Sequence, residues 1–326
     1  MVTKSRWSLW AAAGVLAAVA AGAWAAEKAP AKPAEKPPVK NTVAPGITGA
    51  ARPFLCSDNV GKRILRISAA GQIEWEHPAA HPQDVWVLPS GNVLFSHVRG
   101  AIEVTPDAAK RIVWEYKSPE KTEVHSCQPL ADGAVLIAEC GTSRFIEVGR
   151  DGAIRKELKI ATTSGLHRQF RIVRKLANGH YLAALNGEKL VREYDADGKV
   201  LRTIAVPGDP YLALRLPNGN TLISCGDGHK VIEVDPQDKV VWELGENDLP
   251  GVPIRFAAGL QRLPNGNTVV ANWGGHGHLG EQPQVVEVTP DKKVVWQVND
   301  WKQWKTISGI QVLDVPGDVT KGEVLR

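Results

Sequence analysis

The chain has 326 residues, 43% of them hydrophobic, and its 39 Lys and Arg exceed its 35 Asp and Glu by a net charge of +4. This excess is spread along the chain and forms no basic stripe of the kind that follows nucleic-acid phosphates. The composition therefore argues against a nucleic-acid-binding protein and leaves a chain long enough to bury a large core.

The first 25 residues have the pattern of a cleavable signal peptide. Lys4 and Arg6 precede an apolar run that begins at Trp7 and ends at Ala23-Trp24-Ala25, the small-x-small pattern that signal peptidase needs. A retained membrane anchor is the alternative, although the run is short for a membrane span and rich in Ala and Gly. The sequence therefore predicts a periplasmic or secreted protein with no membrane span in its mature part.

A segment of low complexity follows the predicted cleavage point. Residues 26–50 alternate Ala, Pro, Lys and Glu, and this composition has too little apolar surface to build a core. We therefore predict a disordered tether over residues 26–50 and one folded domain over residues 51–326.

The predicted domain contains a repeated hairpin turn. Asn-Gly and Asp-Gly pairs between apolar runs are the strongest short signal for a β-hairpin. Successive copies lie about 40 to 50 residues apart, the spacing of four short strands in a propeller blade. The copies are Leu88-Pro-Ser-Gly-Asn, Leu130-Ala-Asp-Gly-Ala, Leu176-Ala-Asn-Gly-His, Leu216-Pro-Asn-Gly-Asn and Leu263-Pro-Asn-Gly-Asn, with Leu313-Asp-Val-Pro-Gly-Asp as a degenerate sixth.

Each turn is followed by strands that alternate polar and apolar residues, as half-buried strands do. The fourth strand of a unit ends in Trp in four units, at Trp75, Trp114, Trp242 and Trp296. Lys156 and Arg202 occupy this position in the other two units. The prediction is an all-β fold of four-stranded blades.

The two ends of the domain complement each other. Residues 53–76 lack a leading strand, whereas residues 308–314 form a leading strand without the other three. Pairing the C-terminal strand with the three N-terminal strands completes one blade. The sequence therefore predicts a closed, six-bladed β-propeller.

The repeated strand, Asn-Gly turn and Val-Val-Trp strand resemble the tryptophan-docked repeat of pyrroloquinoline-quinone (PQQ) propellers. The pattern is also similar to the propeller of bacterial arylsulfotransferases. Quinoprotein dehydrogenases of the first type usually have eight blades, an adjacent Cys-Cys pair and a calcium ion, and this chain has six predicted blades and no Cys-Cys pair. The resemblance therefore implies the architecture without PQQ, and we expect no organic cofactor.

The histidines are predicted to lie on one face of the ring. Eight of the nine fall in loops between blades or near the ends of second strands, and only His180 maps to the face that carries the Asn-Gly turns. If each turn has two residues, Leu88 faces Val93, so Asp84 lies opposite His97 and Ser126 opposite Glu139. A ring of polar side chains is then predicted around one channel mouth: Asp58, Asp84, His97, Glu139 and Asn272. The alternative is an ordinary wet, polar propeller channel.

Long loops add charged and aromatic groups around the same mouth. Arg171 and Arg255 offer guanidinium groups that bind carboxylate, sulfate or phosphate at two points. Tyr211 and Trp273 add aromatic surface for a sugar or aryl ring. The alternative is that the arginines pair with acidic residues of neighbouring loops, such as Glu246 or Glu281.

A divalent metal is a further alternative. His276 and His278 form a His-x-His pair in a glycine-rich loop, with His97, His125 or Glu139 as further ligands. The four cysteines are a separate question. Their predicted positions allow at most one disulfide, Cys127 to Cys140, and the alternative is four buried thiols.

Two functions are compatible with these residues. The first is a monomeric, exported propeller that binds a small anionic or carbohydrate ligand, or a partner protein, at this mouth. The second is an enzyme on the same face. The resemblance to arylsulfotransferases implies a histidine nucleophile, for which His125 and His167 are the candidates beside Arg171 and Arg255. A metal-assisted lyase or hydrolase is the other enzymatic version.

Overall fold

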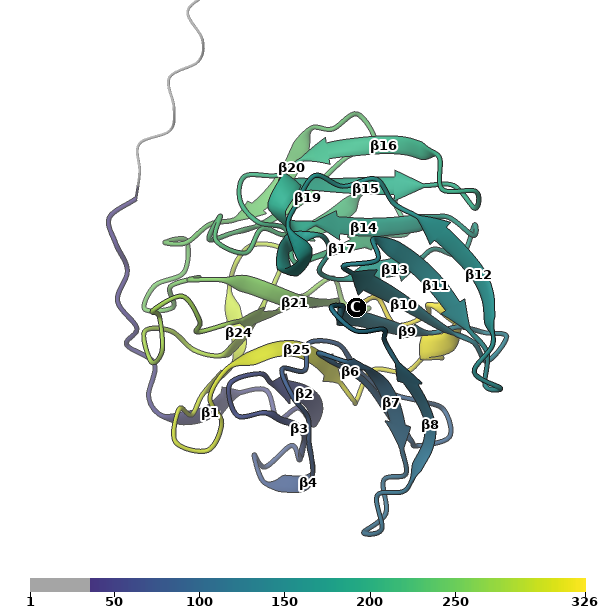
Figure 1. Ribbon diagram of the computed structural model, residues 1–326. Helices are drawn as coiled ribbons and strands as arrows, with labels where there is room; N and C mark the ends of the chain where they lie inside the picture. Colours follow the sequence, from purple (N-terminus) through teal and green to yellow (C-terminus); the bar gives the residue numbers. More distant parts are fainter. Residues whose placement is uncertain (1–35) are drawn as a thin grey trace, which may run out of the picture. The chain divides into compact units, whose positions relative to one another are not determined.

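Six antiparallel sheets surround a central axis in residues 36–326, the part of the chain that the computed structural model describes (Figure 1). The predicted signal peptide and residues 26–35 of the predicted tether lie outside the described residues. No helix in residues 36–326 is long and apolar enough to cross a membrane.

Each sheet is a blade whose innermost strand faces the axis. The blade that closes the ring contains β25 (Ile307–Val312), β2 (Phe54–Asp58), β3 (Arg63–Ile67) and β4 (Ile73–Pro78). The next contains β5 (Val85–Val87), β6 (Val93–His97), β7 (Gly100–Val104) and β8 (Ile112–Lys117). The third contains β9 (Glu123–Pro129), β10 (Val135–Cys140), β11 (Arg144–Val148) and β12 (Ile154–Lys159).

The remaining blades follow in chain order. The fourth contains β13 (Val173–Lys175), β14 (Tyr181–Leu185), β15 (Leu190–Tyr194) and β16 (Val200–Ala205). The fifth contains β17 (Leu212–Arg215), β18 (Thr221–Ser224), β19 (Val231–Val234) and β20 (Val240–Leu244). The sixth contains β21 (Ala257–Arg262), β22 (Thr268–Asn272), β23 (Val285–Val288) and β24 (Val294–Asn299). Three short 3₁₀ helices complete the described elements: η1 (Leu166–Arg168), η2 (Asn186–Glu188) and η3 (Val319–Lys321).

The ring closes as the sequence predicts. Strand β25, near the C-terminus, pairs with β2, and β3 and β4 complete the same sheet. The Ser57 and Ser308 hydroxyls, from the two ends of the domain, lie 2.9 Å apart in this seam. The all-β, six-bladed propeller is therefore confirmed.

One part of the segment predicted as a tether is a strand. Strand β1 (Gly46–Gly49) pairs with β24 as a fifth strand at the outer edge of its sheet. Val43, Ile47 and Ala50 pack against the core cluster of that blade. The prediction of disorder from composition therefore does not hold up to residue 50. The physical reason is that these apolar side chains become buried when the segment covers the edge of β24.

The register of the hairpins differs by one residue from the prediction. Val87 pairs with Val93, and the Leu88 amide donates to the Asn92 carbonyl. Gly91 has a φ of 85°, so the turn has three residues and ends in a left-handed glycine. The expected two-residue turn was wrong, and the pairings built on it move by one position, or by two where a β-bulge follows, as at Glu139.

Two of the four fourth-strand tryptophans hydrogen-bond to a neighbouring blade. Trp114 Nε1 donates to the Gly149 carbonyl at 3.1 Å, and Trp242 Nε1 donates to the Pro290 carbonyl at 2.8 Å. Both acceptors lie in a turn between third and fourth strands of another blade. Arg202, which replaces Trp in its blade, reaches Asp238 of the next blade at 2.7 Å. In these three blades the fourth-strand position therefore docks onto another blade through either Trp or Arg.

The central channel is closed at mid-depth by an ion cluster. The Asp84 carboxylate accepts from Arg174 at 2.7 and 2.9 Å, and the Arg326 guanidinium lies 3.8 Å from it. Both guanidiniums pack over the Trp86 ring, at 4.8 and 4.0 Å from its centroid. The space left beside this cluster is about 10 Å³, room for a single water molecule at most. Each mouth of the channel is therefore a blind pocket.

Candidate functional site

A pocket of about 670 Å³ occupies the channel mouth on the face that carries the loops between blades. This volume lies in the range of pockets that hold small organic ligands. We call it the histidine-side pocket, because four histidines line it together with acidic, basic and aromatic residues. The histidines are His81, His125, His167 and His276.

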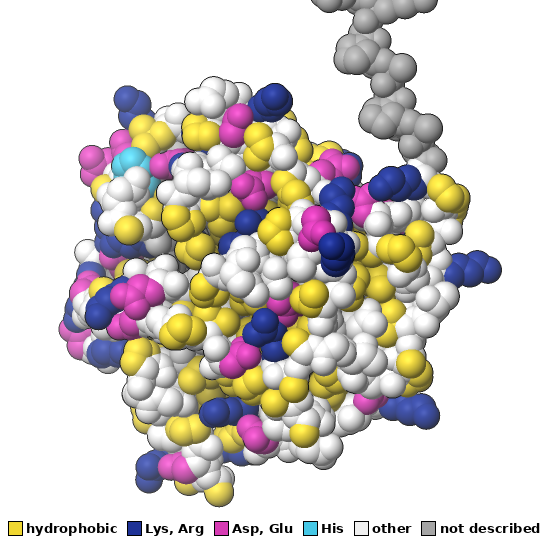
Figure 2. Space-filling model, turned by 180° about the vertical axis from the view of Figure 1, so that it is seen from behind, with side chains coloured by type: hydrophobic (Ala, Val, Ile, Leu, Met, Phe, Trp, Pro, Cys, Tyr) yellow, Lys and Arg dark blue, Asp and Glu magenta, His cyan; other side chains and the backbone are white. Residues whose placement is uncertain are grey.

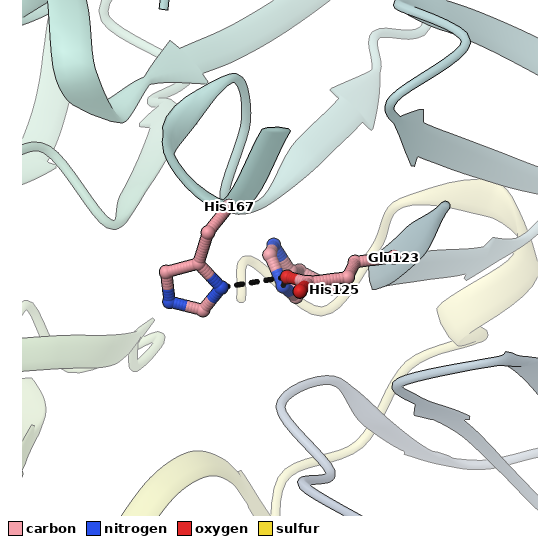
Figure 3. Close-up of side chains that lie close together, drawn as sticks. All are labelled: Glu123, His125 and His167. Atoms are coloured by element: carbon pink, nitrogen blue, oxygen red, sulfur yellow. Dashed lines mark hydrogen bonds and ion pairs between the residues drawn. The ribbon is translucent and has the colours of Figure 1, made fainter. Parts of the chain in front are cut away.

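Two imidazoles and a carboxylate meet on one side of this pocket (Figure 3). Glu123 Oε2 lies 3.1 Å from His125 Nε2 and 2.6 Å from His167 Nδ1. One ligand atom from each of the three residues lies within 4.8 Å of the other two. The rings of His125 and His167 meet edge to face, with 5.4 Å between their centroids.

Local backbone features bring these three side chains together. Glu123 begins β9, and the pairing of β9 with β10 slips by one residue at His125, which leaves His125 unpaired in a β-bulge. The bulge turns His125 inward, and its side chain is almost fully buried. His167 comes from η1 in the next loop and is mostly exposed. A rigid strand therefore supplies two of the groups and a loop supplies the third.

The charges of the cluster follow from burial and contact. Burial lowers the pKa of His125, and the neighbouring Arg171 guanidinium lowers it further, so this imidazole is neutral near pH 7. Contact with the His125 and His167 imidazoles holds the pKa of Glu123 to about 2, so this side chain is a carboxylate. The cluster thus presents one negative charge to two imidazoles.

Arg171 lies beside the cluster and has no acidic partner. Its Nη1 donates to the carbonyl oxygens of His167 and Phe170 and lies 3.3 Å from His125 Nδ1. No carboxylate of residues 36–326 lies within ion-pair distance of this guanidinium, whereas its neighbour Arg168 pairs with Asp209 at 2.7 Å. Arg171 therefore offers a positive charge to whatever enters the pocket.

The opposite wall is aromatic. Phe256 meets Trp273 edge to face with 4.9 Å between centroids, and Tyr211 meets Phe256 at 6.2 Å. His276 packs on the same pair and is hydrogen bonded to Asp227 at 2.9 Å. The Tyr211 hydroxyl is buried near Ser308 but has no hydrogen-bond partner in the described chain. A buried hydroxyl without a partner is costly unless a ligand or water completes it.

The other mouth of the channel holds a second pocket of about 690 Å³ with different chemistry. Its lining includes Leu176, Leu216 and Val324 together with Arg174 and Lys321, and none of its lining residues is a histidine. The view in Figure 2 shows a face with a hollow centre and hardly any histidine surface. Four of the nine histidines thus line the histidine-side pocket, and none lines the opposite one.

Several residues predicted to line the channel mouth have structural roles instead. Asp84 lies deeper, in the ion cluster that closes the channel. His97 Nδ1 accepts from the Arg99 amide outside the pocket, and Glu139 is buried beneath Arg144 at 2.6 Å. Asn272 holds the preceding loop by accepting from the Arg255 and Phe256 amides and donating to the Pro253 carbonyl. The one-residue error in register accounts for Asp84 and His97, whereas β-bulges move the pairing of Glu139 and Asn272 by a further residue.

Arg255 and His278 also find partners outside the pocket. Arg255 Nη1 pairs with Glu246, and its Nε lies 3.8 Å from Glu281, the pairing that the sequence left open as an alternative. His278 Nδ1 bonds to Glu281 at 2.7 Å, whereas His276 bonds to Asp227, so the two histidines face different carboxylates. Of the predicted residues, the structure therefore places His125, His167, Arg171, Tyr211, Trp273 and His276 at the pocket.

Glu123 is the member of the cluster that the sequence reasoning missed. Its signal was the spacing Glu123-x-His125 at the start of a strand, which keeps two side chains near one another. The assumed two-residue turn placed Glu139 at the channel mouth instead. The four cysteines are all buried and free, so the Cys127–Cys140 bridge does not form.

Comparison with known proteins decides the family. The model of the Mal s 1 allergenic protein-like family matches residues 62–252, more than half of the chain. The chain belongs to this family. A solved structure of a protein of unknown function from Bacteroides caccae is 32% identical, covers 80% of this chain and 98% of its own length, and has a TM-score of 0.73. A comparison with curated proteins gave no match.

More distant solved structures share the fold. A streptogramin B lyase is 11% identical with a TM-score of 0.55 and covers 77% of this chain and 84% of its own. A virginiamycin B lyase from Staphylococcus aureus is 13% identical with a TM-score of 0.56 and covers 78% of this chain and 89% of its own. The resemblance to PQQ-type repeats and arylsulfotransferases thus identified the propeller architecture, whereas the family is the Mal s 1-like one.

Proposed function

We propose that this Mal s 1-like protein binds a small organic anion with a flat ring in the histidine-side pocket. The observation that carries the proposal is Arg171, a partly buried guanidinium at the pocket without an acidic partner in the described chain. A desolvated positive charge is unfavourable unless an anion or oriented dipoles compensate it. The ligand's carboxylate, sulfate or phosphate would supply that compensation.

The other walls support an amphipathic ligand. Phe256 and Trp273 present aromatic surface on the side of the pocket away from the Glu123 cluster, and offset or edge-to-face contact with a ring stabilises a bound aryl group. The Tyr211 hydroxyl and the Ser308 side chain offer hydrogen-bonding groups at the pocket. A carbohydrate anion would use the same three elements.

A matched pair of probes tests the charge requirement. We expect 4-bromobenzenesulfonate to bind and the nearly isosteric, neutral 4-bromobenzenesulfonamide to bind at least about ten-fold more weakly, measured by isothermal titration and by quenching of tryptophan fluorescence. Arg171→Gln should weaken sulfonate binding by roughly 10- to 100-fold, the effect of losing a charge-assisted hydrogen bond. Arg255→Gln is the control, because that guanidinium pairs with Glu246 outside the pocket.

Two results would refute this proposal. One is equal binding of the two probes, and the other is equal loss of binding in Arg171→Gln and Arg255→Gln. Melting temperatures of all three proteins accompany the titrations, so that a folding defect is recognised.

A catalytic role for the same pocket is the second candidate. Its support is the contact of His167 Nδ1 with Glu123 at 2.6 Å, which orients the imidazole while most of its side chain is exposed. An imidazole held by a carboxylate in this way can act as a general base or as a nucleophile. Transfer of sulfate from an aryl sulfate to a phenol, measured for wild type and His167→Gln, tests it. Absence of turnover in wild type would eliminate this candidate.

A further inference from the structure

We propose that Glu123, His125 and His167 bind one divalent transition-metal ion of the Zn²⁺ type. The three ligand atoms, Glu123 Oε2, His125 Nε2 and His167 Nδ1, lie within 4.8 Å of one another. Two imidazoles and one carboxylate form a donor set that suits Zn²⁺, Fe²⁺, Co²⁺ and Ni²⁺. This inference is independent of the organic ligand proposed above, because it concerns the metal alone.

The contacts of His125 are those of a metal-binding imidazole, with one ring nitrogen on a backbone carbonyl and the other toward Glu123. A neutral imidazole carries one N–H, and His125 Nδ1 lies 3.0 Å from the Phe170 carbonyl oxygen, which can only accept. If Nδ1 carries the hydrogen, then the lone pair of Nε2 faces the Glu123 carboxylate at 3.1 Å. Two acceptors in that position repel each other unless a proton or a metal ion lies between them.

The other tautomer is less favourable. With the hydrogen on Nε2, His125 would donate to Glu123, but its Nδ1 lone pair would face the Phe170 carbonyl oxygen at 3.0 Å. The Arg171 Nη1 group lies farther from Nδ1, at 3.3 Å, and already donates to the carbonyl oxygens of His167 and Phe170. A backbone carbonyl that fixes one ring nitrogen is also the usual outer partner of a metal-binding histidine.

The geometry needs little adjustment to accept an ion. Metal–nitrogen and metal–oxygen bonds of about 2.0 to 2.2 Å place neighbouring ligand atoms roughly 3.0 Å apart in octahedral and roughly 3.4 Å apart in tetrahedral coordination. His125 and Glu123 already satisfy this spacing at 3.1 Å, and His167 would move outward from 2.6 Å. His167 can do so because its side chain is 64% exposed and lies on the short helix η1. All three side chains, drawn in Figure 3, line the histidine-side pocket.

The other histidine–carboxylate pairs of residues 36–326 lack this arrangement. His180 contacts Glu193 at 2.8 Å, and His276 contacts Asp227 at 2.9 Å, in each case with one imidazole for one carboxylate. His278 likewise has Glu281 as its only acidic partner there. We therefore propose the metal site at the Glu123 cluster and not at His276 and His278. The single histidine–carboxylate pairs provide matched controls.

The test is a titration of the metal-free protein with Zn²⁺. After dialysis against a chelator, wild type should bind one Zn²⁺ per chain by isothermal titration. Glu123→Gln and His167→Gln, both at partly exposed positions, should bind roughly 100-fold more weakly, since even the loss of an outer partner costs 10- to 100-fold. His180→Gln and His278→Gln should bind like wild type. Loading with Co²⁺ should give a visible absorption spectrum in wild type and not in His167→Gln.

Three results would overturn the proposal. They are the absence of one-to-one binding in a folded wild type, unchanged affinity in a folded His167→Gln or Glu123→Gln, and loss of binding in a folded His278→Gln. None of these results bears on sulfonate binding at Arg171, so the two proposals fail separately.

Discussion

Substitution of Asp84 by Asn should strongly destabilise the propeller, because Asp84 is the acidic group between two buried arginines. Its carboxylate accepts from Arg174 at 2.7 and 2.9 Å, accepts from the Cys127 amide at 3.2 Å and lies 3.8 Å from Arg326. All three charged side chains are at most 7% exposed. Asp84→Asn keeps the shape but removes the acidic side chain that both buried guanidiniums face.

The magnitude follows from the cost of an uncompensated buried charge. Removal of one partner of a buried pair costs about 3 to 5 kcal/mol. For a domain of this size each kcal/mol lowers the melting temperature by about 2 to 4 °C, so the expected shift is roughly 6 to 20 °C. Circular dichroism during heating measures it. The matched control is Asp238→Asn, whose side chain is 54% exposed and whose pairing with Arg202 is worth at most about 1 kcal/mol.

The melting temperatures of the two variants test whether Asp84 stabilises the buried cluster. If Asp84→Asn melts within about 2 °C of wild type while Asp238→Asn does the same, the cluster does not close the channel as described. The double variant Asp84→Asn with Arg174→Gln adds a second check. It should be less destabilised than the sum of the two single variants by more than about 1 kcal/mol, because the groups share one network.

Two further predictions concern stability. Trp114→Phe should cost about 1 kcal/mol in urea unfolding, because it removes the hydrogen bond to the Gly149 carbonyl between blades, and an unchanged midpoint would contradict this docking role. Asp248 gives a pH dependence: burial raises its pKa, but the Gly245 amide and Lys292 outweigh this and hold the pKa to about 2. Because the folded state lowers the pKa of Asp248, its carboxylate stabilises the fold at pH values above about 4. That stabilisation is lost as the pH falls toward 2. Asp248→Asn should therefore be about 1 kcal/mol less stable than wild type at pH 6 and equal to it at pH 2, and a constant difference would count against this assignment.

The architecture was readable from the sequence because its signals are local. Asn-Gly turns at regular spacing, alternating strands and the incomplete units at the two ends predict six blades and the seam between β25 and β2. The exact register of the hairpins could not be read from the sequence, since Pro89 and Gly91 allow a three-residue turn as readily as a two-residue one. One residue of register moved Asp84 from the expected partner His97 to pairing with Ser96.

The site was predicted only in part, for a physical reason. His125, His167 and Arg171 lie at strand ends and loops on one face, so blade topology alone brings them together. Which charges remain available depends on contacts between distant segments. Arg255 is neutralised by Glu246, and the Asp84 carboxylate is used by Arg174, 90 residues away. Ion pairs of this kind cannot be predicted from the spacing of residues in the sequence.

The most direct test of the central claim is a crystal structure of the protein soaked with 4-bromobenzenesulfonate. The account predicts an anomalous bromine peak beside Phe256 and Trp273, with the sulfonate on the Arg171 guanidinium. A peak in the opposite pocket near Leu216 and Val324, or no peak at a saturating concentration, would contradict it.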